Sequence, residues 1–94
     1  MSPKSPVVAM TLGNRQIAVR RVALTPTELA VVLGERSDDI LSRLKAGDLD
    51  PVRGNARWLV RVESAVAFAE AKFQPGLLGR EALDRLEALI ERRA

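Results

Sequence analysis

The chain has 94 residues, the size of one small domain, and its 47% hydrophobic and 29% charged residues are typical of a globular protein rather than of a disordered tail or a membrane protein. Cysteine and histidine are both absent, which excludes disulfides, thiolate or imidazole metal ligands and catalytic dyads that need histidine. We therefore expect a binding module without a cofactor rather than an enzyme, and the net charge of +3 raises the question of a nucleic-acid partner.

The first 23 residues are predicted to form a basic arm. Two β-branched segments, residues 7–12 and 16–22, lie on either side of Gly13-Asn14, a pair that tolerates positive φ and suits a tight hairpin turn. An isolated hairpin is only marginally stable, so we expect it to lean on the rest of the domain or on a partner subunit. Residues 1–24 carry no acidic side chain and four basic ones, Lys4, Arg15, Arg20 and Arg21.

A first short helix is predicted to begin after Thr25. Thr25 and Glu28 have the spacing of a capping box, and Pro26 suits the first helical position. Gly34 is a good C-terminal breaker, so we expect the helix to end there. Its predicted apolar face consists of Leu29, Ala30, Val32 and Leu33.

A second short helix is predicted from Ser37 to Ala46. We expect Ser37 to cap it, with Asp38 and Asp39 in the first turn, where carboxylates suit the positive end of the helix dipole. Two short helices separated by a turn are a candidate helix-turn-helix, although helix pairs are also the commonest packing unit of small α proteins. The side chains predicted to face inward are Ile40, Leu41 and Leu44.

A β-hairpin of the size of a DNA-binding wing is predicted next. Residues 48–53 and 57–60 are two short extended segments, and residues 54–56 join them. Trp58, the only tryptophan, is expected to be a core anchor beneath the first and third helices rather than a base-stacking platform.

Two further helices are predicted over residues 62–73 and 80–93. Phe68 and Phe73 are expected to belong to the core. The last helix carries an apolar stripe, which can either complete the core of the monomer or pair with a symmetry mate, so residues 77–94 are a possible dimerisation helix. The stripe consists of Leu83, Leu86, Leu89 and Ile90.

Three runs of the chain, residues 24–34, 40–49 and 51–60, together resemble the excisionase and MerR-like winged helix-turn-helix family. The shared features are a Leu-Thr start, a glycine after each of the first two helices, a proline in a short strand, a glycine-bearing wing and an aromatic residue before a closing helix. The resemblance implies a mainly α fold with a small β-hairpin wing. In this scheme residues 24–73 form the winged helix-turn-helix domain, between an N-terminal β arm and a C-terminal helix.

The resemblance also implies which residues contact DNA. The helix over residues 37–46 would lie in the major groove, and the wing would approach the minor groove or the backbone. Arg43 would read guanine through O6 and N7, and Ser37 or Ser42 would bind a phosphate. The implied contacts are Arg36, Ser37, Ser42, Arg43, Lys45, Arg53, Asn55, Arg57 and Arg61.

Asp38 and Asp39 depart from the family pattern, which favours basic or hydroxyl side chains at the front of the recognition helix. Two carboxylates there would repel phosphates, unless they read cytosine amino groups or cap the helix while pointing away from DNA. Residues 25–72 hold seven basic and eight acidic side chains, a net charge of −1. A domain that keeps the fold without binding DNA is therefore an alternative.

The function implied is that of an excisionase, a recombination directionality factor, or of a related transcriptional regulator that binds and bends duplex DNA without performing chemistry. The expected partners are duplex DNA, a second copy of the chain and an integrase. Two alternatives stay open: a small-terminase-like phage packaging subunit that assembles through the last helix, and a protein-interaction adaptor. No apolar run is long enough to span a membrane, so we expect a cytoplasmic protein.

Overall fold

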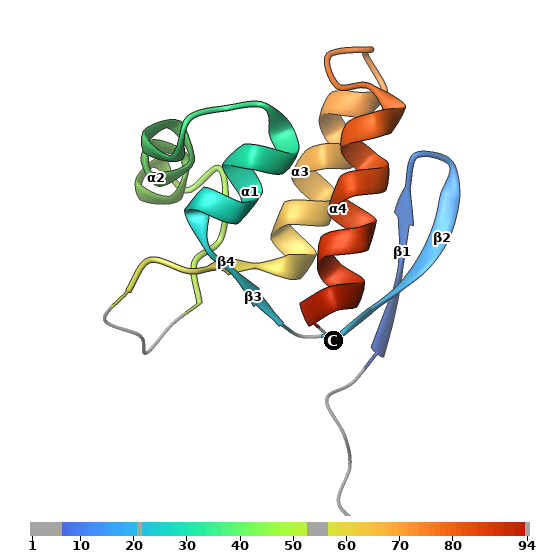
Figure 1. Cartoon of the computed structure of the whole chain (residues 1–94), viewed down its shortest axis with the longest axis horizontal. Helices are drawn as coiled ribbons and strands as arrows, with labels where there is room; N and C mark the ends of the chain where they lie inside the picture. Colours follow the sequence, from blue (N-terminus) through green and yellow to red (C-terminus); the bar gives the residue numbers. More distant parts are fainter. Residues whose placement is uncertain (1–6, 21, 53–56, 94) are drawn as a thin grey trace, which may run out of the picture.

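The computed structural model describes residues 7–20, 22–52 and 57–93 (Figure 1). Within these residues the chain forms four helices and two small antiparallel sheets, so the fold is helical with a minor β component. The strands are β1 (Val7–Leu12), β2 (Arg15–Arg20), β3 (Ala23–Leu24) and β4 (Val60–Arg61). The helices are α1 (Pro26–Leu33), α2 (Ser37–Ala46), α3 (Val62–Phe73) and α4 (Arg80–Arg93).

Strands β1 and β2 form the predicted hairpin. Leu12 lies opposite Arg15, so the turn consists of Gly13 and Asn14, whose φ angles are 62° and 68°. Positive φ at both central positions is what a type I′ turn requires, and the twist of that turn matches the twist of paired strands. The second strand ends at Arg20 rather than at the predicted residue 22, and the next strand, β3, begins at Ala23.

The hairpin packs against α3 and α4. Leu12 and Val19 are fully buried in the same core as the helices. From the start of β2, Arg15 reaches two carboxylates on α4, with its Nη2 3.1 Å from Asp84 Oδ1 and 2.7 Å from Glu87 Oε1. We expected the hairpin to be supported either by the rest of the domain or by a partner subunit. The structure shows support from the rest of the domain.

Helix α1 begins and ends where its local signals predict. Thr25 Oγ1 accepts a hydrogen bond from Glu28 N at 3.1 Å, and Thr25 N donates to Glu28 Oε1 at 2.9 Å, which completes the capping box. Gly34 ends the helix in the left-handed conformation, with φ of 70°. The predicted apolar face is buried: Leu29, Ala30, Val32 and Leu33.

Helix α2 has the predicted bounds, but the prediction that Ser37 caps it is wrong. Arg36 is the last residue in extended conformation, with φ of −89° and ψ of 148°, so Ser37 is already the first helical residue. Within the described part of the chain, the N-cap residue Arg36 makes no capping hydrogen bond with its side chain. The apolar face is as expected, with Ile40 and Leu44 buried and Leu41 partly buried.

Part of the predicted wing is present as paired backbone. Val52 N donates to Leu59 O at 2.9 Å, and Pro51 forms a β-bridge with Val60. Residues 53–56, which include the predicted tip, lie outside the described residues. The two segments on either side of the tip are therefore held together by backbone hydrogen bonds.

The pairing of β3 with β4 is a feature that the sequence does not predict. Leu24 lies opposite Val60, and Ala23 lies opposite Arg61. Because Val60 also bridges to Pro51, it lies between the strand that precedes α1 and the first segment of the wing. This arrangement ties the paired wing segments to the start of α1.

The prediction that Trp58 anchors the core is wrong, because its side chain is 43% exposed. The aliphatic side chains of Leu49 and Val60 are fully buried at the two ends of the wing, so the core beneath it is already filled and the indole projects outward. Phe68 and Phe73 are partly buried and pack at the margin of the core rather than at its centre.

Helices α3 and α4 have the predicted bounds and pack side by side, and α4 also contacts α1 (Figure 1). The apolar stripe on α4 lies in the core of the monomer, which is the first of the two roles expected for it. Each of its side chains is at most 4% exposed: Leu83, Leu86, Leu89 and Ile90. No helix in the described part of the chain has both the length and the apolar character needed to cross a membrane.

Candidate nucleic-acid interface

The polar face of α2 is open to solvent, whereas its opposite face is buried in the core. Among the contacts implied for this region, Arg36, Ser42 and Lys45 are exposed and Ser37 is half-buried. Helix α2 therefore presents hydrogen-bond donors and two cations on an accessible surface.

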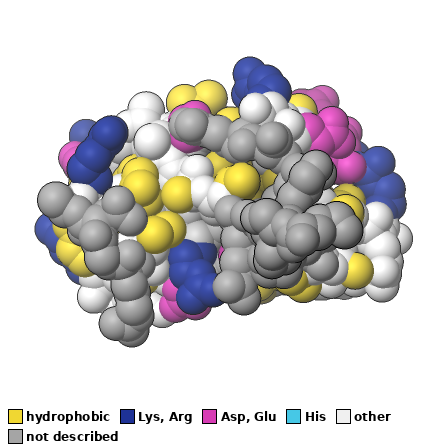
Figure 2. Space-filling model, turned by 90° about the horizontal axis from the view of Figure 1, so that it is seen from below, with side chains coloured by type: hydrophobic (Ala, Val, Ile, Leu, Met, Phe, Trp, Pro, Cys, Tyr) yellow, Lys and Arg dark blue, Asp and Glu magenta, His cyan; other side chains and the backbone are white. Residues whose placement is uncertain are grey.

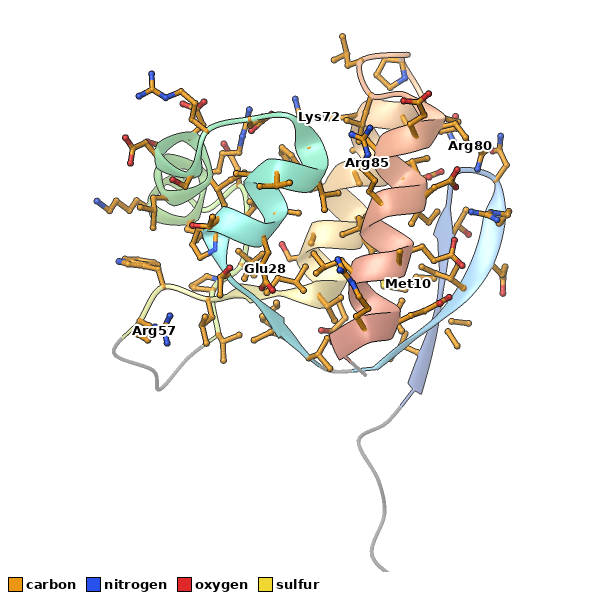
Figure 3. All side chains as sticks on the ribbon, viewed as in Figure 1. Met10, Glu28, Arg57, Lys72, Arg80 and Arg85 are labelled. Carbon is orange, nitrogen blue, oxygen red and sulfur yellow. The ribbon has the colours of Figure 1, made fainter. Side chains whose placement is uncertain are left out.

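Two further implied contacts, Arg57 and Arg61, lie on the segment that leads into α3. Both are exposed, and Arg61 Nη2 is 3.6 Å from Glu63 Oε2 at the start of that helix. Figure 3 shows Arg57 at the end of the molecule where α2 lies, away from the β1–β2 hairpin. Arg53 and Asn55 lie outside the described residues. The structure thus brings Arg57 and the polar face of α2 to the same end of the molecule.

Arg43 differs from the other implied contacts because its guanidinium is engaged within the chain. Its Nε lies 3.3 Å from Glu35 Oε1, and its Nη2 lies 3.4 Å from Glu35 Oε2. The guanidinium carbon is also 4.9 Å from the centroid of the Phe68 ring, and the side chain is 30% exposed. The residue expected to read guanine therefore uses its donor fork on a neighbouring carboxylate.

Carboxylates interrupt the cationic surface around α2. Asp38 and Asp39 are exposed in its first turn, and Asp48 is exposed just after its end. On the face of the molecule seen from below, Figure 2 also shows basic and acidic side chains next to one another. The local field is of mixed sign, which weakens the steering of a polyanion. A shallow hollow on this surface is lined by Asp39, Ser42, Arg43, Ala46 and Asp48.

Three residues near this surface have roles that the sequence does not reveal. Glu35 binds Arg43 across the turn between α1 and α2, and no helical spacing connects residues eight positions apart across a turn. Lys72 Nζ lies 5.1 Å from the centroid of the same Phe68 ring. Ser64 Oγ accepts a hydrogen bond at 2.9 Å from the backbone N–H of residue 50, which holds the segment before the wing on α3.

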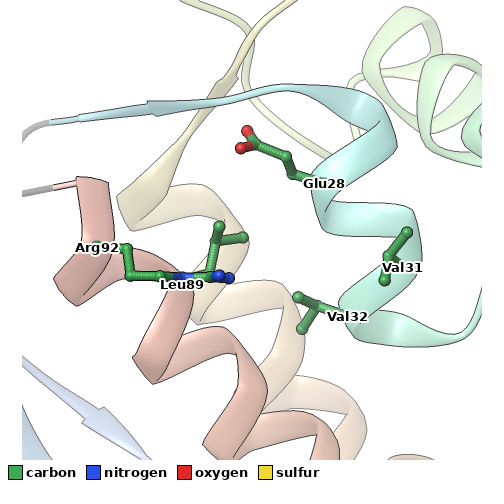
Figure 4. Close-up of a pocket in the computed structure, with 5 residues that line it drawn as sticks. All are labelled: Glu28, Val31, Val32, Leu89 and Arg92. Atoms are coloured by element: carbon green, nitrogen blue, oxygen red, sulfur yellow. The ribbon is translucent and has the colours of Figure 1, made fainter.

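A second hollow, between α1 and α4, contains none of the implied DNA contacts (Figure 4). Val31 is 70% exposed at its margin, and the carboxylate of Glu28 accepts the capping hydrogen bond from Thr25 N. The side chains that line it are Glu28, Val31, Val32, Leu89 and Arg92.

Among the described residues, no acidic side chains gather in a group of three or more that could hold a metal ion. No protein-family model, curated protein or solved structure matches the chain. Its function is therefore inferred from the arrangement of its own residues.

Proposed function

We propose that this chain is a small DNA-binding protein that contacts duplex DNA through α2 and the wing. One observation carries the proposal: two short helices are joined by residues 34–36, the polar face of the second helix is exposed, and the chain that follows it pairs Pro51 with Val60. This arrangement supports the winged helix-turn-helix fold that the sequence resemblance implies. In that fold the second helix enters the major groove and the wing follows the backbone or the minor groove.

In this proposal the exposed cations bind phosphates and fix the register of the protein on DNA. Arg36 and Lys45 at the two ends of α2, together with Arg57 on the wing, are exposed and can take this role. Ser42 lies between them and can face base edges or a phosphate. The biological role proposed is that of an excisionase-type directionality factor or a related transcriptional regulator, which occupies and bends DNA. A second copy and an integrase are the protein partners that this role implies.

The phage-packaging alternative depends on the apolar stripe of α4 to assemble an oligomer. Because that stripe is buried in the core of the chain, its side chains offer little surface for assembly, and the exposed face of α2 favours DNA binding instead.

Salt dependence of binding tests the proposal. With a fluorescent random-sequence duplex, anisotropy titrations should give a log K that falls linearly with log salt, by about 0.9 for each phosphate contact. Lys45→Ala and Arg57→Ala should each weaken binding to all sequences and reduce the steepness of the slope by about 1. Arg85→Ala is the matched control, since it removes an arginine that is 60% exposed on α4, outside the proposed surface.

A protein-interaction adaptor on the same fold is the second candidate. It is favoured by the exposed carboxylates of Asp38 and Asp39 at the front of α2 and by the engagement of Arg43 within the chain. Absence of binding at low salt, or binding that does not weaken as salt rises, would contradict the DNA proposal and support the adaptor.

A further inference from the structure

Glu35, Arg43 and Phe68 form a cluster at the junction of three elements. Glu35 lies in the turn before α2, Arg43 lies on α2, and Phe68 lies on α3. The carboxylate takes the Nε and Nη2 donors of the guanidinium at 3.3 and 3.4 Å, and the guanidinium stacks over the aromatic ring at 4.9 Å. Arg43 is thereby held against the body of the domain from two sides.

The donors that Glu35 occupies are the same donors that an arginine offers to DNA. A guanidinium binds a carboxylate, a phosphate or a guanine edge in similar forked geometry. Arg43 cannot present its Nε and Nη2 fork to a phosphate while Glu35 holds it. The carboxylate of Glu35 therefore occupies the two donors that a DNA phosphate would use.

The contact is accessible enough to be exchanged. The side chains of Arg43 and Glu35 are 30% and 21% exposed, so water reaches the pair, and a partly exposed ion pair is weak. Lys72 lies over the same ring, with its Nζ 5.1 Å from the centroid. When Arg43 leaves, the ring of Phe68 keeps one cation, which lowers the cost of its departure.

We propose that Glu35 is an internal competitor that withholds Arg43 from the DNA backbone and thereby sets the affinity of the α2 surface. Glu35 is a positioning residue in this scheme, because it acts on DNA only through Arg43. The inference rests on the proposed function, since it concerns the affinity of the same surface for duplex DNA.

Replacing the carboxylate should release Arg43. Glu35→Gln is expected to strengthen binding to a random-sequence duplex about twofold to fivefold, the range to which a partly exposed ion pair corresponds. It should also make the dependence of log K on log salt steeper by about 1, because one more phosphate is contacted. Fluorescence anisotropy with the labelled duplex measures both quantities, and circular dichroism checks the fold of each variant.

A double-mutant cycle separates this mechanism from a general effect of charge. In an Arg43→Ala background, Glu35→Gln should no longer steepen the slope or give its additional gain in affinity. Asp38→Asn is the matched control, since it removes one exposed carboxylate from the first turn of α2, three residues after Glu35. Its effect should be the same with and without Arg43. Glu35→Asp, which keeps the charge but shortens the reach to the fork, serves as a second variant if Glu35→Gln fails to fold.

The possible outcomes are distinct. An unchanged or lower affinity of Glu35→Gln would show that the pair is only structural. An equal gain with and without Arg43 would show a general charge effect, and either result overturns the inference while leaving the DNA proposal standing. If the wild-type chain shows no salt-dependent binding, the proposed function fails and this inference fails with it.

Discussion

Gly13 occupies a position that any other residue can take only under strain. Its φ of 62° lies in the left-handed region, which favours glycine. A Cβ added there would lie 2.6 Å from Arg80 Nη1 and 2.6 Å from Leu83 Cδ1. Arg80 is exposed and can move, but Leu83 is fully buried and cannot. The turn needs glycine both for its backbone and for its close approach to α4.

Gly13→Ala should therefore destabilise the protein by about 2–4 kcal/mol, through left-handed strain and crowding against Leu83. Gly79→Ala is the control, because Gly79 has no positive φ and a Cβ added at this position would meet open space. Urea denaturation followed by circular dichroism gives both free energies of unfolding. Equal values for the two variants would contradict the close approach of the turn to α4.

Side-chain environments were the part of the structure that local pattern could not predict. Whether Ser37 caps α2 depends on which residue last keeps an extended backbone, and that residue is Arg36. The partners of Arg43 come from the preceding turn and from α3. The exposure of Trp58 depends on core residues that fill the space beneath it. In each case the environment of the side chain depends on how separate elements meet. The periodicity of a single sequence carries no information about such contacts.

Whole elements were more predictable, because their ends are coded by neighbouring residues. Helix α1 begins at a capping box and ends at a left-handed glycine. The bounds of α3 follow from its apolar spacing and from the break at residues 74–76. Strand β3 was missed, since two residues are too few to show any alternation, whereas β4 begins at Val60, the last residue of a predicted extended segment. The pairing of β3 with β4 joins distant backbone segments, so it could not be found from sequence pattern.

One contact between elements also depends on pH. Gly13 N donates to Glu70 Oε1 at 2.6 Å, which joins the hairpin turn to α3. Gln74 Nε2 donates to Glu70 Oε2 at 2.8 Å, and Arg80 lies nearby. These groups, with the Gly13 backbone N–H foremost, favour the charged carboxylate and lower the pKa of Glu70. The contact between hairpin and α3 is therefore strongest when Glu70 is ionised.

Because the pKa of Glu70 is lowered from its ordinary value of 4.5 in the folded chain, its stabilising effect is complete above that value and is lost as pH falls through the lower, folded pKa. Glu70→Gln should remove this part of the acid sensitivity. Its free energy of unfolding should fall less than that of the wild type between about pH 6 and about pH 3. Parallel pH profiles for Glu70→Gln and the wild type would count against the assignment.

At the scale of the whole molecule, one core runs through all the parts. Leu12 and Val19 of the hairpin, the buried faces of α1 to α3 and the stripe of α4 belong to the same cluster. The predicted divisions near residues 24 and 77 do not separate independent cores. Buried side chains on both sides of each division belong to the same cluster. The hairpin and α4 are therefore expected to unfold together with the central helices.

Leu12→Ala tests this continuity. Truncating a fully buried leucine should cost about 2–5 kcal/mol, and hydrogen exchange should show lost protection in α1 and α3 as well as in the hairpin. Thr11→Ala, on an exposed position of the same strand, should change stability by less than about 0.5 kcal/mol. Loss of protection confined to residues 7–20 would show that the hairpin unfolds by itself.

The exposed indole of Trp58 also determines how the molecule can be observed. The chain has one tryptophan and no tyrosine, so its ultraviolet emission comes from this side chain. Because Trp58 is 43% exposed, water already reaches its indole in the folded chain, so loss of the core changes its emission less than it would for a buried indole. The same indole is sensitive to anything that covers the segment before α3. Native fluorescence is therefore a poor reporter of stability here and a direct optical reporter of occupancy at the wing.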